Sequence, residues 1–367
     1  MSTLVTSVKL FVATIVICGW LANQSQAFQS FSDIIPRQRS SSAAVFGATK
    51  EVEFDSTFTP PDTSTIDEEA CKDTASKMKR IMVRVSKDVS PSGSVGISYV
   101  HWPAAEEKEK TNSLPLIMIH GFDSSALEYR RLGSKLAARG IDTYAVDLLG
   151  WGFSQLNDVS SFSAQSKVEA LKSFTEIMLG TDGKFGIAGA SLGGAAVIEL
   201  AAANSDVCKA LVLIDAQGFV DGIGPMQYLP KPLASIGAQI LQSVPLRSSA
   251  NQMSYYDTDT YATDDALNTS RLHCLRDGWS DALVSFMQSG GFSPSAKVSQ
   301  INAPTLVLWG REDGILDGTE FANKFVSTLP NGRLQWIEQC GHVPHLEQPE
   351  KTADAITEFL TTEISSS

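Results

Sequence analysis

The stretch FGIAGASLGGAAVIELAAA, residues 185–203, joins a short apolar run to a longer alanine-rich segment. The run is typical of a strand buried on both faces, and the segment after it is typical of a helix. Ser191 stands between them in the pattern Gly189-x-Ser191-x-Gly193. At a strand-to-helix junction this pattern indicates a nucleophile elbow, a sharp turn that exposes a serine hydroxyl at the carboxyl edge of a sheet. We therefore predict that Ser191 is a nucleophile.

Similar apolar runs recur along the chain and alternate with helix-like segments. The runs span 114–120, 143–148, 185–190, 210–215 and 305–310, and the helix-like segments span 126–139, 163–179 and 192–203. This alternation predicts an α/β fold with a largely parallel sheet. Two earlier segments, 81–85 and 95–102, alternate in the manner of antiparallel strands.

A long segment between the last two of these runs breaks the alternation. Residues 216–298 contain no run typical of a buried parallel strand, and a structureless loop of that length is unusual. We predict an inserted, mainly helical cap at 216–298 over a core formed by 79–215 and 299–363. Its apolar side chains are expected to pack among helices, and some to line a pocket between cap and sheet, a favoured place for ligands. They are Met226, Tyr228, Leu229, Leu233, Ile236, Ile240 and Leu241.

The segment before the core, residues 51–78, has little apolar periodicity. It carries the pair Pro60-Pro61 and an acidic patch at 67–69. This composition predicts a linker or an irregular arm.

A serine hydroxyl is a weak nucleophile until a base removes its proton. Of the five histidines, only His342 and His345 follow the last apolar run. His342 follows a glycine in a loop after 334–338, where a base can reach Ser191. We predict His342 as the base and His345 as a packing or hydrogen-bonding partner.

The carboxylate that orients the base is expected at the end of a strand. Asp313 comes just after the run at 305–310 and is the predicted acid. Asp317, four residues later, is an alternative that suits the cap of the next helix. Asp215, at the end of the preceding strand, is a second alternative.

Stabilising a tetrahedral intermediate needs two backbone N–H donors aimed at its oxygen. The residue after the nucleophile, Leu192, supplies one of them. The other is predicted at Phe122, in the His120-Gly121-Phe122 turn that ends the run at 114–120. His120 itself is expected to be structural.

Together these motifs resemble the α/β-hydrolase superfamily. The resemblance covers about 79–362 and is carried, in order, by LIMIHGFDSS (116–125), DLLGWGFS (147–154), GASLGG (189–194), VLWGREDGILD (307–317) and GHVPHLEQPE (341–350). It implies the α/β-hydrolase fold, a mostly parallel twisted sheet flanked by helices, with the cap of the epoxide-hydrolase-like branch. Ser191 replaces the carboxylate nucleophile of that branch's epoxide hydrolases and haloalkane dehalogenases, which argues against those activities. The cap is similar to that of uncharacterised plastid hydrolases of plants and algae.

The leading functional hypothesis is a serine hydrolase that cleaves a lipophilic carboxylic ester through an acyl-enzyme. Ser191, His342 and Asp313 form the predicted catalytic triad, and Phe122 and Leu192 the oxyanion hole. The resemblance also leaves open C–C bond hydrolysis, perhydrolysis or lyase chemistry with the same triad. A further alternative is a small-molecule receptor with residual hydrolase activity, as in some plant hormone receptors of this fold.

Charge and cysteine content limit the possible partners. The formal net charge of −12 argues against a nucleic-acid partner, which would need clustered Lys and Arg. The five cysteines show no spacing typical of a metal site, and we predict buried free thiols rather than a disulfide framework. No metal or organic cofactor is expected, and the predicted partner is a small apolar ester.

The sequence of the N-terminus predicts a leader in two parts. Lys9 precedes an uncharged apolar run at 10–22, and Ser25-Gln26-Ala27 is a small-x-small cleavage site, so 1–27 is a predicted signal peptide. The run is too short to span a bilayer, and no membrane span is expected after its removal. Residues 28–50 are rich in serine, with a single acid, which is typical of a transit peptide. A signal peptide, a phenylalanine at 28 and then a transit-like stretch resemble the bipartite plastid leader of diatoms and related algae.

Two routes therefore stay open for the chain. We predict delivery to the plastid through the endoplasmic reticulum, with secretion or an endomembrane location as the alternative. On either route the Asn268-Thr269-Ser270 sequon is a candidate for glycosylation.

A fusion of residues 1–60 to a fluorescent protein tests the leader. Expressed in a diatom, it is expected to accumulate in the plastid. Fluorescence confined to the endoplasmic reticulum or the medium would contradict plastid delivery and support the secretory alternative.

Overall fold

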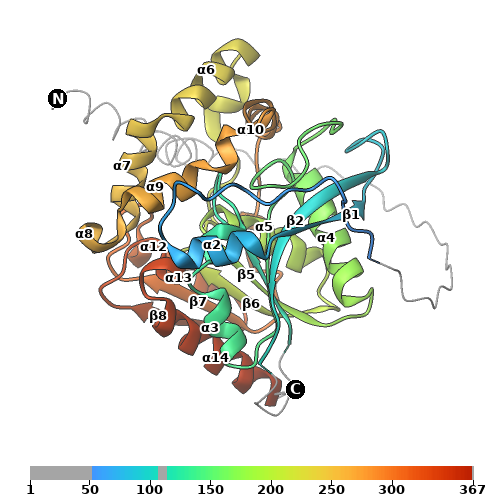
Figure 1. Cartoon of the computed structure of the whole chain (residues 1–367). Coiled ribbons are helices and arrows are strands. Elements are labelled where there is room, and N and C mark those ends of the chain that lie inside the picture. The colour runs from blue at the N-terminus through green and yellow to red at the C-terminus, as the bar shows by residue number, and fades with distance from the viewer. Residues whose placement is uncertain (1–51, 106–113, 366–367) are drawn as a thin grey trace, which may run out of the picture.

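An eight-stranded sheet with the strand order β1-β2-β4-β3-β5-β6-β7-β8 lies at the centre of the protein (Figure 1). The computed structural model describes residues 52–105 and 114–365, so both predicted leader segments and Cys18 lie outside the described residues. The strands are β1 (Lys79–Arg84), β2 (Ser94–Trp102), β3 (Leu116–Ile119), β4 (Thr143–Val146), β5 (Phe185–Ala190), β6 (Cys208–Ile214), β7 (Thr305–Gly310) and β8 (Gly332–Ile337).

Of the eight described strands, β2 runs opposite to the other seven. β1 pairs with β2 and β2 with β4 in antiparallel fashion, whereas every pair from β4 to β8 is parallel. The predicted α/β fold with a largely parallel sheet is therefore confirmed. The chain passes from β3 to β4 on one side and returns to β5 on the other side of β3. Loops that leave two such strands diverge at their carboxyl ends and open a crevice, which is where ligands bind in sheets of this kind.

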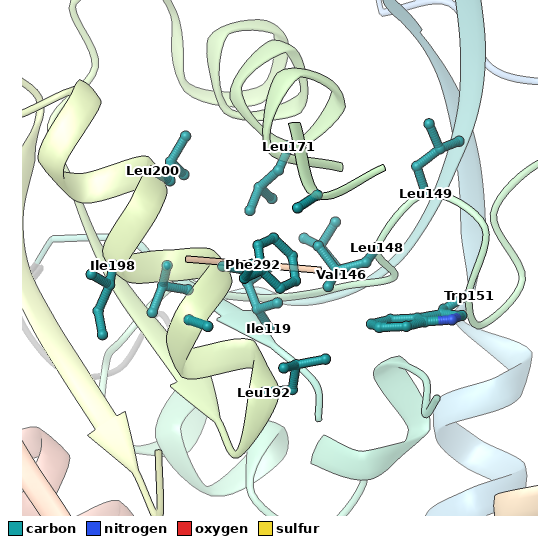
Figure 2. Packing of buried hydrophobic residues seen from close by; sticks show 14 of the residues in the cluster. Ile119, Val146, Leu148, Leu149, Trp151, Leu171, Leu192, Ile198, Leu200 and Phe292 are labelled. Atoms are coloured by element: carbon teal, nitrogen blue, oxygen red, sulfur yellow. The ribbon is translucent and has the colours of Figure 1, made fainter. Parts of the chain in front are cut away.

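Helices cover both faces of the sheet because its strands are apolar on both faces. Ile117 and Ile119 of β3 belong to the core on one side, and Leu116 and Met118 to the core on the other. Figure 2 shows part of the first core, where Ile119, Leu171 and Phe292 converge. The helices outside the cap are α2 (Glu69–Ser76), η1 (Ala126–Tyr129), α3 (Gly133–Ala138), α4 (Ala164–Leu179), α5 (Leu192–Ala203), α12 (Gly318–Thr328), α13 (Pro344–Glu347) and α14 (Pro349–Ser365).

The segment between β6 and β7, all of which is described, contains helices and no strand. These are η2 (Gly224–Tyr228), α6 (Lys231–Gln242), α7 (Val244–Ser254), α8 (Thr258–Tyr261), α9 (Asp264–Arg271), η3 (His273–Leu275), α10 (Trp279–Gln288) and α11 (Ser295–Val298). In Figure 1, α6, α7 and α10 lie at the top of the view, above the sheet. We refer to residues 216–298 as the cap.

The segment before β1 is more ordered than a linker. Phe54 pairs with Ile81 of β1, and residues 69–76 form α2. Glu68 joins this segment to the core through ion pairs of 2.8 Å with Arg130 and 2.6 Å with Arg131. The arm is thus fixed by contacts with residues far away in the sequence, which local periodicity does not reveal.

Two further features of the described residues bear on the sequence analysis. Their cysteines, at 71, 208, 274 and 340, are buried free thiols, as predicted. None of their helices has both the length and the apolar character needed to cross a bilayer.

Candidate active site

Ser191 lies in a strained turn between β5 and α5. Its backbone has φ 50° and ψ −122°, a conformation that residues other than glycine rarely adopt. Hydrogen bonds fix the turn: Ser191 N donates to Ile214 O at 3.0 Å, and Ser191 O accepts from Gln217 N at 2.8 Å. Strain of this kind persists only where the surrounding structure holds it, and it is concentrated at functional sites.

Glycine is required beside Ser191 because backbone segments meet there. A Cβ atom at Gly193 would lie 2.4 Å from Ile119 O, and one at Gly189 would lie 2.4 Å from Gly193 O. No rotation of a side chain relieves a clash with a carbonyl oxygen. The spacing of the GxSxG motif therefore follows from the packing of α5 against the ends of β3 and β5.

His342 and Asp313 form a hydrogen-bonded pair at 2.8 Å, between Nδ1 and Oδ2. Their side chains are only 6% and 1% exposed. Burial alone would lower the pKa of His342, but the Asp313 carboxylate outweighs it and raises that pKa above its usual value. Burial would likewise raise the pKa of Asp313, but His342 and the N–H groups of 315 and 316 hold it below its usual value.

The structure brings all five predicted site residues to one cavity or to its edge. Ser191, His342, Phe122 and Leu192 line the cavity, and Asp313 contacts it through His342. Among the described residues no hydrogen bond joins Ser191 Oγ to His342 Nε2. This contact is often loose in unliganded enzymes and tightens in the substrate complex.

The two alternative acids have different environments. Asp317 caps α12, because its Oδ1 accepts a hydrogen bond from Glu320 N at 3.0 Å. Asp215 is fully buried. One carboxylate oxygen of Asp215, one of Asp313 and one ring nitrogen of His342 all lie within 4.8 Å of one another. Asp215 Oδ1 accepts from Gly310 N at 2.9 Å, whereas Oδ2 has no partner in the structure. Burial, together with the nearby Asp313, raises the pKa of Asp215 well above its usual value.

Two histidines outside the pair support the loop that carries Phe122. His120 Nε2 accepts from Leu148 N at 3.1 Å, which leaves Nδ1 to donate to Gly121 O at 2.8 Å. His345 Nε2 is bonded to Glu128 at 2.9 Å, and Glu128 in turn accepts from Gly121 N at 3.0 Å. Both histidines therefore have the structural roles that the sequence analysis expected.

A buried charge cluster connects the same loop to the cap and was missed in the sequence. Asp123, which follows Phe122, forms an ion pair with Arg247 of α7. Its Oδ1 also accepts from Trp279 Nε1 at 2.7 Å and lies 3.1 Å from His273 Nε2. Burial would raise the pKa of Asp123, but Arg247 and His273 hold it well below its usual range. These partners follow Asp123 by 124 to 156 residues, so no local pattern predicts them.

The cavity has a volume of about 370 Å³ and lies between the cap and the carboxyl edge of the sheet. Most of its lining is apolar, with contributions from the cap and from the loops after β7 and β8. The apolar residues include Val220, Ile223, Met226, Leu241, Leu246, Met287, Ile315, Leu316, Val343 and Leu346. Of the cap residues predicted to line a pocket, Met226 and Leu241 do so.

A comparison of the sequence with models of protein families agrees with the elbow, the histidine–aspartate pair and the cap. The model described as "Alpha/beta hydrolase family" matches residues 116–355. The chain belongs to this family. It is 32% identical over 305 residues to the alpha/beta hydrolase domain-containing protein VTE7 of Arabidopsis thaliana, an alignment that covers 83% of this chain and 90% of that protein.

Two other relatives of this hydrolase are named for their reactions or substrates. It is 28% identical to 2-hydroxy-6-oxo-6-(2'-aminophenyl)hexa-2,4-dienoic acid hydrolase of Metapseudomonas resinovorans, over 67% of this chain and 84% of that protein. It is also 28% identical to Lipase 1 of Psychrobacter immobilis, over 67% of this chain and 76% of that protein. The relatives of this chain thus include a protein named as a lipase and one named as a dienoic acid hydrolase.

Substitution of the two neighbouring acids separates their roles. Asp313→Asn is expected to lower kcat/KM by about 10³- to 10⁴-fold, since His342 loses the carboxylate that orients it and stabilises its charged form. Asp215→Asn leaves the hydrogen bond between His342 and Asp313 in place and is expected to change kcat/KM by less than about threefold. A large loss in Asp215→Asn with little loss in Asp313→Asn would assign the acid to Asp215.

The pH profile of the same variants gives a second readout. His342 must be unprotonated to act as a base, so activity is expected to rise with pH through its raised pKa. In Asp313→Asn the rise in activity is expected to occur at lower pH, because the carboxylate no longer stabilises the protonated form of His342. A rise at the same pH in both proteins would show that Asp313 is not the cause of the raised pKa of His342.

Asp123→Asn tests the buried cluster. The change leaves the Arg247 guanidinium largely buried without a counter-charge, and the expected cost is about 3 kcal/mol of unfolding free energy. Thermal denaturation checks it. Asp158→Asn is the matched control, since Asp158 also has a positive φ, 55°, but is exposed. Equal melting temperatures for the two variants would contradict a stabilising cluster.

Proposed function

We propose that this chain is a serine hydrolase that cleaves a carboxylic ester with a large apolar group. The observation that carries the proposal is the meeting of a strained serine and a buried histidine–aspartate pair in an apolar cavity. Similarity to Lipase 1 supports ester chemistry. The predicted leader supports a plastid location, where acyl lipids and prenyl-type esters are candidate substrates.

In the proposed mechanism Ser191 Oγ attacks the acyl carbonyl carbon while His342 Nε2 takes the hydroxyl proton. Asp313 holds His342 Nδ1–H and stabilises the imidazolium that forms. The N–H groups of Phe122 and Leu192 stabilise the oxyanion, a contribution of roughly 3–4 kcal/mol for each donor. His342 then returns the proton to the alcohol oxygen as the ester C–O bond breaks. Water hydrolyses the acyl-enzyme by the same steps and frees Ser191.

The cavity defines the kind of ester that fits. Apolar side chains form most of its wall, so an alkyl or prenyl chain gains about 25 cal/mol for each Å² that it buries. Long apolar esters are therefore expected to be better substrates than charged ones.

A second candidate is hydrolysis of a C–C bond with the same residues. It is favoured by the similarity to the hexadienoic acid hydrolase of Metapseudomonas resinovorans. Turnover of a dienoic or 1,5-diketone substrate, with no turnover of esters, would favour this candidate.

A fluorophosphonate probe tests for an activated serine without knowledge of the substrate. We expect the adduct on Ser191 by peptide mass spectrometry, and loss of labelling in His342→Ala. Ser191→Ala is expected to reduce hydrolysis of p-nitrophenyl esters at least about 10⁴-fold with an unchanged circular dichroism spectrum.

Ser254→Ala is the matched control for these measurements. Ser254 also lines the cavity, but its hydroxyl donates to Ala250 O at 2.8 Å and lies in no predicted catalytic pair. Labelling and turnover are expected to persist in this variant. Turnover that survives intact in Ser191→Ala would refute the proposed mechanism.

A further inference from the structure

Large apolar side chains lie exposed on the outer surface of the cap, around α6 (Figure 1). Six of them are between 37% and 79% exposed. Leu233, Ile236 and Ile240 recur every three or four residues, a spacing that places them on one side of α6. Tyr228 and Leu229 lie just before α6, and Val244 begins α7. We call this set the outer stripe: Tyr228, Leu229, Leu233, Ile236, Ile240 and Val244.

The buried side of α6 is formed by small residues. Ala234 and Ala238 are at most 1% exposed, and α6 packs against α10. In an ordinary amphipathic helix the large apolar residues face the core and polar residues face water. Here the arrangement is inverted, so packing within the protein does not explain the outer stripe. Contiguous exposed apolar surface of this kind marks an interaction site.

The outer stripe also lies in a segment without acidic residues. Residues 222–256 contain no Asp or Glu, although the whole chain has a net charge of −12. The cation at the start of α6, Lys231, is 67% exposed and lies 3.2 Å from Asp281 of α10. Unpaired carboxylates are costly to desolvate in the headgroup region of a bilayer. Residues 222–256 supply none, and Asp281 beside them is paired with Lys231.

The outer stripe and the cavity share the same short elements. Ile240 of α6 faces outward, while the next residue, Leu241, lines the cavity. In η2, Tyr228 is exposed and Met226 lines the cavity. Figure 1 shows α6 at the outer end of the cap, away from the sheet. The outer stripe and the cavity are therefore separated only by the thickness of α6 and η2, which is the distance that an apolar molecule would cross.

We propose that the outer stripe docks on the surface of a lipid bilayer, so that the cap collects an apolar substrate from the membrane. Docking follows from the exposed side chains alone, whereas collection of a substrate rests on the proposed ester hydrolysis. A second copy of the chain is a poorer fit to this surface. Protein interfaces are enriched in aromatic residues and arginine and bury about 800 Å² per partner, whereas the outer stripe is aliphatic apart from Tyr228.

Flotation with neutral phosphatidylcholine vesicles tests the docking. The full chain is compared with a Leu233→Gln, Ile236→Gln, Ile240→Gln variant, and these three residues do not line the cavity. All proteins compared also carry Ile15→Asp and Ile17→Asp, so that the apolar run at 10–22 does not itself bind lipid. The outer stripe is expected to bind vesicles equally at low and high salt, because insertion is apolar. The triple substitution is expected to weaken binding at least about tenfold.

Phe54→Gln is the matched control, because Phe54 is 55% exposed on the arm beside β1, outside the cap. It is expected to leave vesicle binding unchanged. Absence of vesicle binding by the intact outer stripe, or an equal loss in the control, would overturn the proposal. So would a dimer in solution that the triple substitution dissociates, because a second copy would then cover the outer stripe.

Failure of docking and failure of the proposed function have different signatures. Vesicle binding needs no substrate and is expected to persist in Ser191→Ala. Hydrolysis of a water-soluble p-nitrophenyl ester is expected to be unchanged by the triple substitution, whereas hydrolysis of an ester carried in vesicles falls with binding. Equal hydrolysis of the vesicle-borne ester by both proteins would contradict collection through the outer stripe.

Discussion

The strained turn at Ser191 is the constraint on which the rest of the site depends. A positive φ at this residue turns the chain from β5 into α5 within one step. It also brings the start of α5 so close to the end of β3 that Gly193 tolerates no side chain. The loop with Phe122 leaves the sheet at that same end, so one turn places both the serine hydroxyl and the loop at its edge. Backbone hydrogen bonds of Ser191 with Ile214 and Gln217 hold the turn in its strained conformation.

Features that depend on local spacing could be predicted from the sequence. The alternation of apolar runs with helical segments specified the sheet, and the helix after Ser191 begins and ends where expected, at 192 and 203. By contrast, α2 and the Asp123 cluster were missed. Glu68 meets Arg130 and Arg131 more than 60 residues later, and Asp123 meets Arg247 after 124 residues. Only the folded chain brings such partners together, since neither set has a periodic signature.

Asp215 and Asp313 show why the sequence alone left the acid open. Both follow the end of a strand, and β6 and β7 are neighbours, so the two carboxyls end up side by side. Their environments then set them apart. Asp313 receives two backbone N–H groups and the His342 ring, whereas Asp215 receives one N–H group. Hydrogen bonds to the charged form favour ionisation and a buried like charge opposes it, so the pKa of Asp313 lies below its usual value and that of Asp215 lies above its own.

The cap is attached by a polar cluster and by the apolar side chains of α10, which pack in the core. Arg247, His273 and Trp279, from three separate cap elements, converge on the Asp123 carboxylate next to Phe122. The Asp123 cluster and the buried Phe286 and Met287 of α10 together anchor the cap, while α6 leaves its large side chains exposed. Its alanines are buried, Leu233, Ile236 and Ile240 are exposed, and Leu241, next to Ile240, lines the cavity. The same elements can therefore form the roof of the cavity and an outward apolar surface.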